Sequence, residues 1–304
     1  MLGYFGPAGT FTHQALLTIS DAEAVPYATV GQAVAAVRSG EIEAALVPIE
    51  NSVEGGVSAT LDILASGRRL VITKEVLLPV QFNLYARPGT TADQVRRVLT
   101  HPHSAAQTRG WMASNLPEAV VTEGGSNAAS AQEVADPESR YDAAICGQIA
   151  GEMYGLVPVA TEIADNASAV TRFVLVSRPT EPTQPTGADK TTLVAYMHTD
   201  RAGALLEILD QFSNRGVSLS RIESRPTKTG LGNYCFSIDA EGHMREPRLA
   251  EAMLGLHRIC AEVVFLGSYP RADGKRTQVA SGFTDADFAA AREWYATLVH
   301  PEDD

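Results

Sequence analysis

The sequence of 304 residues has few of the features that mark membrane and secreted proteins. It contains no apolar run of about 18 residues, which is roughly what a spanning helix needs. Its first residues, MLGYFGPAGTF, do not place a basic segment before an apolar one. We therefore expect neither a membrane span nor a secretory signal, and we expect a cytoplasmic location.

Cysteine is scarce. Cys146, Cys235 and Cys260 are odd in number and widely separated, which fits neither a disulfide framework nor a zinc ribbon. We expect each of them to be a small buried hydrophobic residue. His101 and His103 flank a proline but have no acidic or cysteine partner at ligand spacing, so we expect no metal at this pair.

Positively charged residues are also in deficit. The chain has 24 Lys and Arg against 36 Asp and Glu, which gives a formal net charge of −12. This balance repels nucleic acid and acidic membranes, and we expect neither as a partner. An anionic substrate would need a locally positive pocket.

Composition divides the chain into a large amino-terminal part and a smaller carboxy-terminal part. The stretch SRPTEPTQPTGADK, residues 177–190, has three prolines and no apolar periodicity, which is typical of an extended linker. After Tyr269 the apolar pattern is lost again, before a short predicted helix at 288–299. We predict a domain at 1–179, a linker at 180–189, a second domain at 190–270 and a tail at 271–304.

Short apolar segments alternate with helical patterns through the first domain, which predicts an α/β fold. The helical patterns include 104–115 and 127–135. The predicted strands are residues 2–5, 44–49, 71–78, 82–86, 97–100, 120–122, 143–146 and 173–176. Ligands bind beyond the carboxyl ends of strands in open α/β sheets, so the loops that leave the strands are where a site is expected.

Three of these loops, GPAGTFTHQA, VPIENSVEGGV and EGGSNAASA, are rich in Gly, Ser, Thr or Asn and run into a predicted helix. Backbone N–H groups at such helix starts bind anions. Capping by Thr10, Ser52 and Ser126 explains each loop taken alone, whereas the three loops together favour a shared site. Glu50 is a candidate acid or base, although a solvated or capping role is more common for a single loop glutamate.

Thr171 and Arg172 directly precede the apolar strand at 173–176, which places a hydroxyl and a guanidinium at its start. A guanidinium can bind a carboxylate through two charge-assisted hydrogen bonds. The alternative is structural: a β-branched residue that starts a strand, and an arginine in a surface ion pair, which is common and weak. The residue pattern alone leaves both interpretations open.

The second domain has a regular pattern. Residues 190–198 and 234–238 alternate as strands, 217–225 is extended, and 263–269 is apolar. Two helical stripes lie at 203–212 and 247–260. The order β-α-β-β-α-β predicts a ferredoxin-like sandwich with two helices on one face of a four-stranded sheet. Edges of such a sheet pair with other copies, so we expect a homo-oligomer, dimer or tetramer, through this domain.

In this order, the motifs resemble those of bacterial prephenate dehydratases. GPAGTFTHQA, VPIENSVEGGV, HPHSAAQ and TRFVLV are similar to motifs of the catalytic domain, and GALLEIL and RIESRP to motifs of its regulatory ACT domain. The resemblance covers nearly all of residues 1–270. It implies a catalytic domain of two α/β lobes around a cleft, similar to a periplasmic binding protein, followed by the ACT domain. It also implies conversion of prephenate to phenylpyruvate with loss of CO2 and water, without a cofactor.

The resemblance assigns Thr171 as the residue essential to turnover, and we expect it to donate a hydrogen bond to the departing oxygen. A threonine hydroxyl is a poor acid near neutral pH, so we expect water or Glu50 to relay the proton. The expected substrate-binding residues are Thr10, Phe11, Asn51, Ser52, Ser126, Asn127, Arg172 and Phe173.

Four positions depart from the family pattern. Many members have asparagine where Ala169 stands, threonine where Asn127 stands and glutamine where His103 stands. In the ACT domain, asparagine is frequent at the position of Ser218. None of these differences affects Thr171.

For the ACT domain, the resemblance implies that free L-phenylalanine binds at a dimer interface and inhibits the enzyme. The expected effector-binding residues are Gly203, Ala204, Leu205, Glu223, Ser224, Arg225 and Pro226. A strand end with a surface ion pair explains residues 223–226 without a ligand. Two other functions fit the motifs: arogenate dehydratase, whose substrate carries an amino group in place of the keto group, and a non-catalytic amino-acid sensor.

Overall fold

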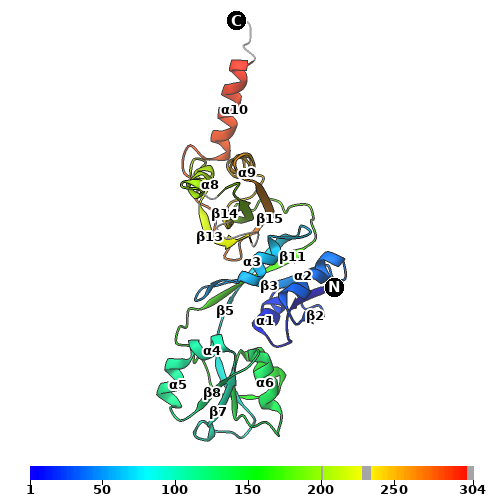
Figure 1. The fold of residues 1–304 in the computed structure, drawn as a ribbon, viewed down its shortest axis with the longest axis vertical. Coiled ribbons are helices and arrows are strands. Elements are labelled where there is room, and N and C mark those ends of the chain that lie inside the picture. The colour runs from blue at the N-terminus through cyan, green and yellow to red at the C-terminus, as the bar shows by residue number, and fades with distance from the viewer. Residues whose placement is uncertain (200, 228–233, 300–304) are drawn as a thin grey trace. The chain divides into compact units, whose positions relative to one another are not determined.

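The computed structural model describes residues 1–199, 201–227 and 234–299 (Figure 1). Two compact units make up the chain. The first comprises Met1–Thr60 and Val76–Val174, and the second comprises Leu61–Glu75 and Leu175–Asp304. In the described ranges, no helix combines the length and the apolar character that crossing a membrane requires.

The first sheet has the strand order β2-β1-β3-β11-β5, with β4 paired to β3. Its strands are β1 (Leu2–Phe5), β2 (Ala24–Tyr27), β3 (Ala44–Asn51), β4 (Gly55–Gly56), β5 (Val71–Pro79) and β11 (Val170–Ser177). Three helices belong to this part of the chain: α1 (Phe11–Leu17), α2 (Val30–Ser39) and α3 (Ser58–Leu64). Strand β1 pairs in parallel with both β2 and β3, as crossover helices require. The division between the two units falls within β5 and β11.

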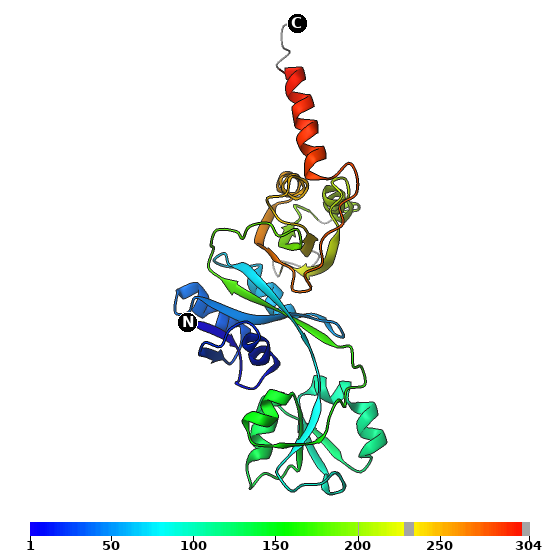
Figure 2. The ribbon, with the colours of Figure 1, turned by 180° about the vertical axis from the view of Figure 1, so that it is seen from behind.

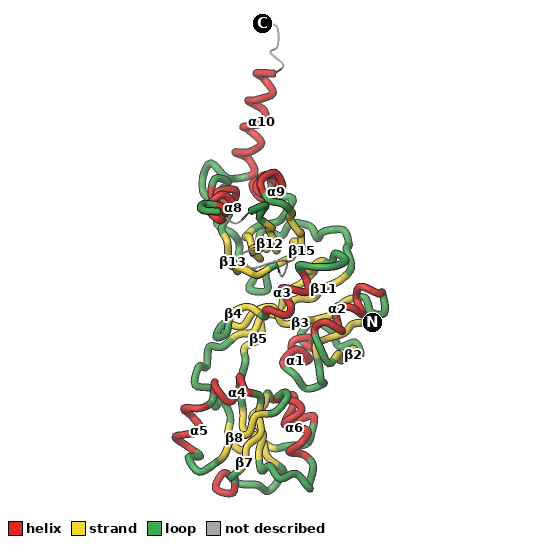
Figure 3. The backbone as a smooth tube through the Cα atoms, in the orientation of Figure 1, coloured by secondary structure: helices red, strands yellow, loops and turns green. Residues whose placement is uncertain are grey.

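The second sheet lies wholly in the first unit, with the order β10-β6-β9-β7-β8. Its strands are β6 (Asn83–Ala86), β7 (Arg97–Thr100), β8 (Val120–Glu123), β9 (Ala143–Cys146) and β10 (Val157–Ala160). The helices around it are η1 (Ala92–Gln94), α4 (Pro102–Gln107), α5 (Arg109–Asn115), α6 (Asn127–Ala135) and α7 (Gln148–Met153). Helices α5 and α6 lie on opposite sides of the sheet (Figures 2 and 3), so the central strands β6 and β9 are buried along their whole length.

The third sheet, in the second unit, is antiparallel with the order β13-β14-β12-β15. Its strands are β12 (Asp189–Tyr196), β13 (Leu219–Pro226), β14 (Tyr234–Glu241) and β15 (Glu262–Pro270). Helices α8 (Ala204–Ser213) and α9 (Pro247–Ile259) bury Ile208, Phe212, Leu249 and Leu256 against one face. Helix α10 (Asp285–Val299) follows, and no residue of it is buried. The predicted β-α-β-β-α-β order is confirmed.

The predicted α/β pattern of the first domain is confirmed, and every predicted strand is present. The sequence pattern missed the short strands β2, β4 and β10, and the predicted helix at 104–115 is two helices that meet at Thr108. The difference that matters most is the start of β11. It begins at Val170, three residues before the predicted start, so Thr171 and Arg172 lie inside the strand.

Candidate active site

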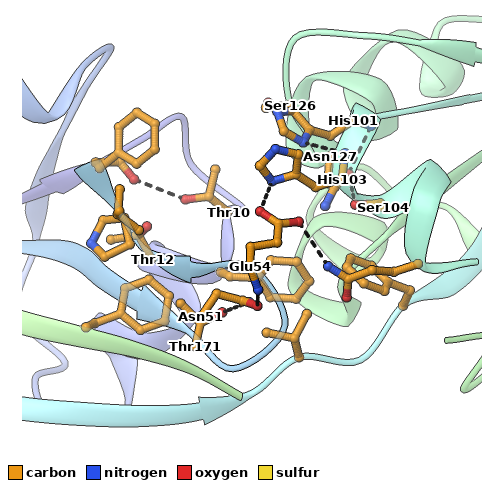
Figure 4. Close-up of a pocket in the computed structure, with 18 of the residues that line it drawn as sticks. Thr10, Thr12, Asn51, Glu54, His101, His103, Ser104, Ser126, Asn127 and Thr171 are labelled. Atoms are coloured by element: carbon orange, nitrogen blue, oxygen red, sulfur yellow. Dashed lines mark hydrogen bonds and ion pairs between the residues drawn. The ribbon is translucent and has the colours of Figure 1, made fainter. Parts of the chain in front are cut away.

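A cavity of about 270 Å³ in the first unit collects most of the predicted site residues (Figure 4). It is lined by residues that follow the carboxyl ends of β1, β3, β7 and β8, where open α/β sheets bind ligands. Of the predicted residues, those that line it are Thr10, Phe11, Asn51, Ser126, Asn127, Thr171 and Phe173. The motifs from four separate loops therefore meet at one place.

Thr171 is oriented by Asn51. The Asn51 Nδ2 donates a hydrogen bond of 2.8 Å to Thr171 Oγ1 (Figure 4). The orientation of the amide is fixed from its other end, because Asn51 Oδ1 accepts the backbone N–H groups of Val53 and Glu54 at 2.8 and 3.2 Å. Since Thr171 Oγ1 accepts from the amide, its own proton is left to donate elsewhere, and the residue faces the cavity.

Arg172 is not among the described residues that line this cavity, and its contact with the substrate stays a prediction. Successive side chains of a strand point to opposite faces. Thr171 and Phe173 both line the cavity, so Arg172 between them points the other way. Its side chain is 6% exposed and its Nη1 lies 3.3 Å from Glu50 Oε2. Glu50 is likewise not among the described residues of the cavity wall, and its role in a proton relay stays a prediction.

The hydroxyls at the loop ends accept hydrogen bonds from backbone N–H groups. Thr10 Oγ1 accepts the N–H of His13 at 3.3 Å, and Ser126 Oγ accepts that of Ala129 at 3.0 Å. Both residues also line the cavity, so capping and a place in the site are not exclusive. Ser52 does not line it: its Oγ accepts the N–H of Val170 at 2.9 Å and holds the hairpin loop to β11.

Asn127 organises the loop that follows β7. Its Oδ1 accepts hydrogen bonds from Thr100 Oγ1, the His101 N–H and Ser104 Oγ at 3.2, 3.2 and 2.9 Å. The start of α6 is thereby tied to the start of α4.

Several polar residues of the cavity were not predicted. They are Glu54, His101, His103, Ser104 and Gln107. Glu54 follows β3, and its Oε2 lies 2.6 Å from His103 Nδ1 on α4. Gln107 Nε2 donates to the other Glu54 oxygen at 3.3 Å, while Gln107 Oε1 is buried without a hydrogen-bond partner. The motifs HPHSAAQ and VPIENSVEGGV contain all five residues, but nothing in the sequence shows that they meet.

The two histidines of the cavity differ in surroundings. Burial lowers the pKa of His101, and the neighbouring His103 lowers it further, while Glu54 and Glu123 oppose both effects. The His101 ring lies edge-on to that of His103, with centroids 4.9 Å apart. Within the described part of the chain, no group of three or more His, Cys, Asp or Glu is arranged to hold a metal.

The three cysteines are free and buried, as predicted. Burial raises the pKa of the Cys146 thiol to about 12. It therefore stays protonated and unreactive at neutral pH.

The predicted effector residues fall on two separate cavities of the second unit. Gly203, Ala204 and Leu205 line one at the start of α8. Arg225 and Pro226 line another, together with residues 61–66 at the end of α3. Arg225 Nε lies 3.1 Å from Asp62 Oδ1, and its Nη1 lies 3.7 Å from Glu223. Ser224 and Glu223 line neither cavity. Within one chain, the two halves of the predicted effector site are not brought together.

Comparisons with known proteins agree with these motifs. The family model for prephenate dehydratase matches residues 2–181, and the ACT domain model matches residues 191–258. A prephenate dehydratase of Amycolatopsis methanolica is 45% identical over 304 residues, which cover 99% of this chain and 98% of that protein.

Two solved structures are also similar. The crystal structure of a prephenate dehydratase from Arthrobacter aurescens in complex with L-Phe has 49% identity and a TM-score of 0.94, covering 98% of this chain and 99% of that one. The prephenate dehydratase structure from Staphylococcus aureus has 26% identity and a TM-score of 0.76, covering 88% and 99%.

Proposed function

The chain belongs to the prephenate dehydratase family and is a decarboxylating dehydratase of prephenate, and we propose that Thr171 assists the departure of the ring hydroxide. In this reaction the bond between the ring and its carboxylate breaks and releases CO2. The electron pair enters the ring, the bond between the ring and the hydroxyl oxygen breaks, and hydroxide leaves. The protein has to hold a dianion and stabilise the charge that develops on the departing oxygen.

The observation that carries the proposal is the hydrogen bond from Asn51 to Thr171 at 2.8 Å. It fixes the hydroxyl as a donor toward the cavity before substrate arrives, and preorganised donors of this type are effective in catalysis. Removing one such donor typically lowers turnover by about 10²–10³-fold. Because Glu50 lies outside the cavity wall, we propose water as the final source of the proton.

Neutral donors hold most of the substrate in this proposal. Within residues 1–199, 201–227 and 234–299, no Lys or Arg lines the cavity. Ser126 and the first N–H groups of α6 supply donors at the positive end of a helix of nine residues. We propose that Arg172 has a positioning role on the face of β11 opposite the cavity. Its ion pair with Glu50 would hold the strand in the orientation in which Thr171 faces the cavity.

We also propose that L-phenylalanine inhibits the enzyme through the ACT domain. The support is the Arthrobacter structure with L-Phe, at 49% identity, together with the cavity at the start of α8. That cavity offers the helix start for a carboxylate and an apolar wall of Met197, Leu209 and Phe236 for a ring. Edge strands β13 and β15 are free to pair, within the described sheet, so we propose a homo-oligomer through this domain.

The test is turnover of purified protein on prephenate, with and without phenylalanine. We expect Thr171→Ala to lower kcat by about 10²–10³-fold with substrate binding retained, and Thr171→Ser to keep part of the activity. Equal turnover in the wild type and Thr171→Ala would refute the role of the hydroxyl. Assay of arogenate beside prephenate measures the preference between the two substrates.

A further inference from the structure

The cavity contains one carboxylate in an unfavourable place for a dianionic substrate. Glu54 lies on the loop between β3 and β4, and its side chain reaches the same cavity as Thr171 (Figure 4). The loop is fixed there, because Asn51 Oδ1 accepts the N–H groups of Val53 and Glu54. A negative side chain held beside a site for two carboxylates repels the substrate unless its charge is cancelled.

His103 is the residue that can cancel it. Its Nδ1 lies 2.6 Å from Glu54 Oε2, the short distance of a charge-assisted hydrogen bond. Gln107, one turn further along α4, donates to the other oxygen but carries no charge. Since no Lys or Arg of the described residues lines the cavity, the positive charge that they can supply there comes from the histidines.

We propose that His103 determines substrate affinity: in its protonated form it neutralises Glu54, so that the cavity accepts the prephenate dianion. The inference deepens the proposed function and rests on it. When His103 loses its proton, the Glu54 carboxylate faces the two carboxylates of the substrate uncompensated, and binding weakens. Imidazole is the side chain that changes charge near neutral pH, so the affinity for substrate should fall as pH rises through that range.

The surroundings of His103 and Glu54 allow His103 to exchange its proton with solvent. The side chains of His103 and Glu54 are 63% and 36% exposed, so protons exchange freely with solvent. The other titratable groups around them are His101, which stacks edge-on with His103, and Glu123, which acts on His101. His101 Nδ1 accepts the N–H of His103 at 3.3 Å, and the partial burial of His101 lowers its pKa, which favours the neutral form. His103 is therefore the imidazole that faces Glu54.

The experiment measures kcat and KM for prephenate from about pH 6 to pH 8.5, across the range in which imidazole titrates, with the rate without enzyme subtracted. The full-length proteins are the wild type, His103→Gln, Glu54→Gln and the double variant. Glutamine is polar, uncharged and close to histidine in size, and thermal melts verify that the variant folds. Wild-type turnover near neutral pH tests the proposed function itself, whereas the pH profile of KM tests only this inference.

We expect the wild-type KM to rise about tenfold over this range, the size of an uncompensated charge at close range, with a smaller change in kcat. At every pH, His103→Gln should have the KM that the wild type reaches at high pH. Glu54→Gln should keep, at every pH, the KM that the wild type has at low pH. The double variant should recover most of what His103→Gln loses. A pH profile that persists unchanged in His103→Gln would assign the effect to His101 and overturn the proposal. A double variant no better than His103→Gln would overturn it as well.

Discussion

Charged side chains have different surroundings around the sheet of the second unit and in the cavity of the first unit. The second unit contains two buried pairs of opposite charge. Arg221, whose side chain is 7% exposed, lies 3.0 Å from the fully buried Asp239. Lys190 lies 2.9 Å from Glu75, with 10% and 2% of their side chains exposed. In the cavity of the first unit, the pair of Glu54 and His103 is more exposed, with 36% and 63% of their side chains open to solvent.

This difference distinguishes charged pairs that stabilise the fold from charged pairs that are open to solvent and ligands. A buried pair is costly to break, because removal of one partner leaves a desolvated charge behind. An exposed pair contributes little to stability, since solvent competes for both groups. The pairs of the second unit therefore hold together the elements that they join, while the response proposed for the pair in the cavity depends on its exposure to solvent.

The largest effect is expected from breaking a buried pair. Lys190→Met removes the ammonium that lies 2.9 Å from Glu75, and we expect the free energy of unfolding to fall by about 3–5 kcal/mol. Urea denaturation measures this loss. The control is Glu118→Gln, which removes a pair with Arg96 whose side chains are 80% and 55% exposed; it should change stability by less than about 1 kcal/mol. Similar losses in the two variants would contradict the distinction between the units.

A smaller effect is expected in the cavity from Asn51→Asp. The new carboxylate accepts a hydrogen bond from Thr171 instead of donating one, so the Thr171 proton is withdrawn from the substrate. We expect kcat to fall by about 10–100-fold, the size of a lost hydrogen bond to a charged group. Asn115→Asp, on the exposed face of α5, serves as a control for the same chemical change. If Asn51→Asp retains wild-type kcat, the orientation of Thr171 by the amide is wrong.

The next prediction concerns Arg225, whose Nε pairs with Asp62 at 3.1 Å. Arg225→Ala should raise the phenylalanine concentration for half-inhibition by about fivefold or more, within the usual range of allosteric coupling. Asp62→Asn distinguishes two roles for the arginine. If Arg225 acts by holding α3 to the sheet, both variants lose inhibition equally. If it binds the effector directly, Asp62→Asn keeps inhibition. Unchanged inhibition in both would place regulation elsewhere.

The smallest effect is a dependence of stability on pH through His243. Its side chain is fully buried, and burial lowers its pKa below the ordinary value. The unfolded state then binds more protons between the folded and unfolded pKa values, so stability is complete above about pH 6.5 and falls as pH drops below it. Thermal melts from pH 8 down to 5.5 should show a shallower decrease in His243→Gln than in the wild type. Identical slopes would assign the decrease to other groups, such as His13 and His101, whose pKa values burial also lowers.

Much of the site was predictable because its residues lie in local motifs. Thr10, Asn127 and Thr171 belong to loops or strand ends whose composition marks them, and the carboxyl ends of parallel strands bring such loops together. The direction of Arg172 was not predicted. The apolar run begins at Phe173, which hid the start of β11 at Val170, and once the strand includes Thr171 and Arg172 their side chains must point to opposite faces.

The sequence by itself determined the order of most helices and strands, the α/β class of the first domain and the ferredoxin-like class of the second. It also determined the motif residues. These features follow from periodicities and turn residues a few positions apart. Only the tertiary structure decided which charges meet. Glu54 and His103, or Arg225 and Asp62, are far apart along the chain, and their contact depends on how separate elements pack. The local sequence pattern does not show which distant residue a side chain will contact. Each side chain fits its own helix, strand or loop whether or not its partner in the folded protein is near.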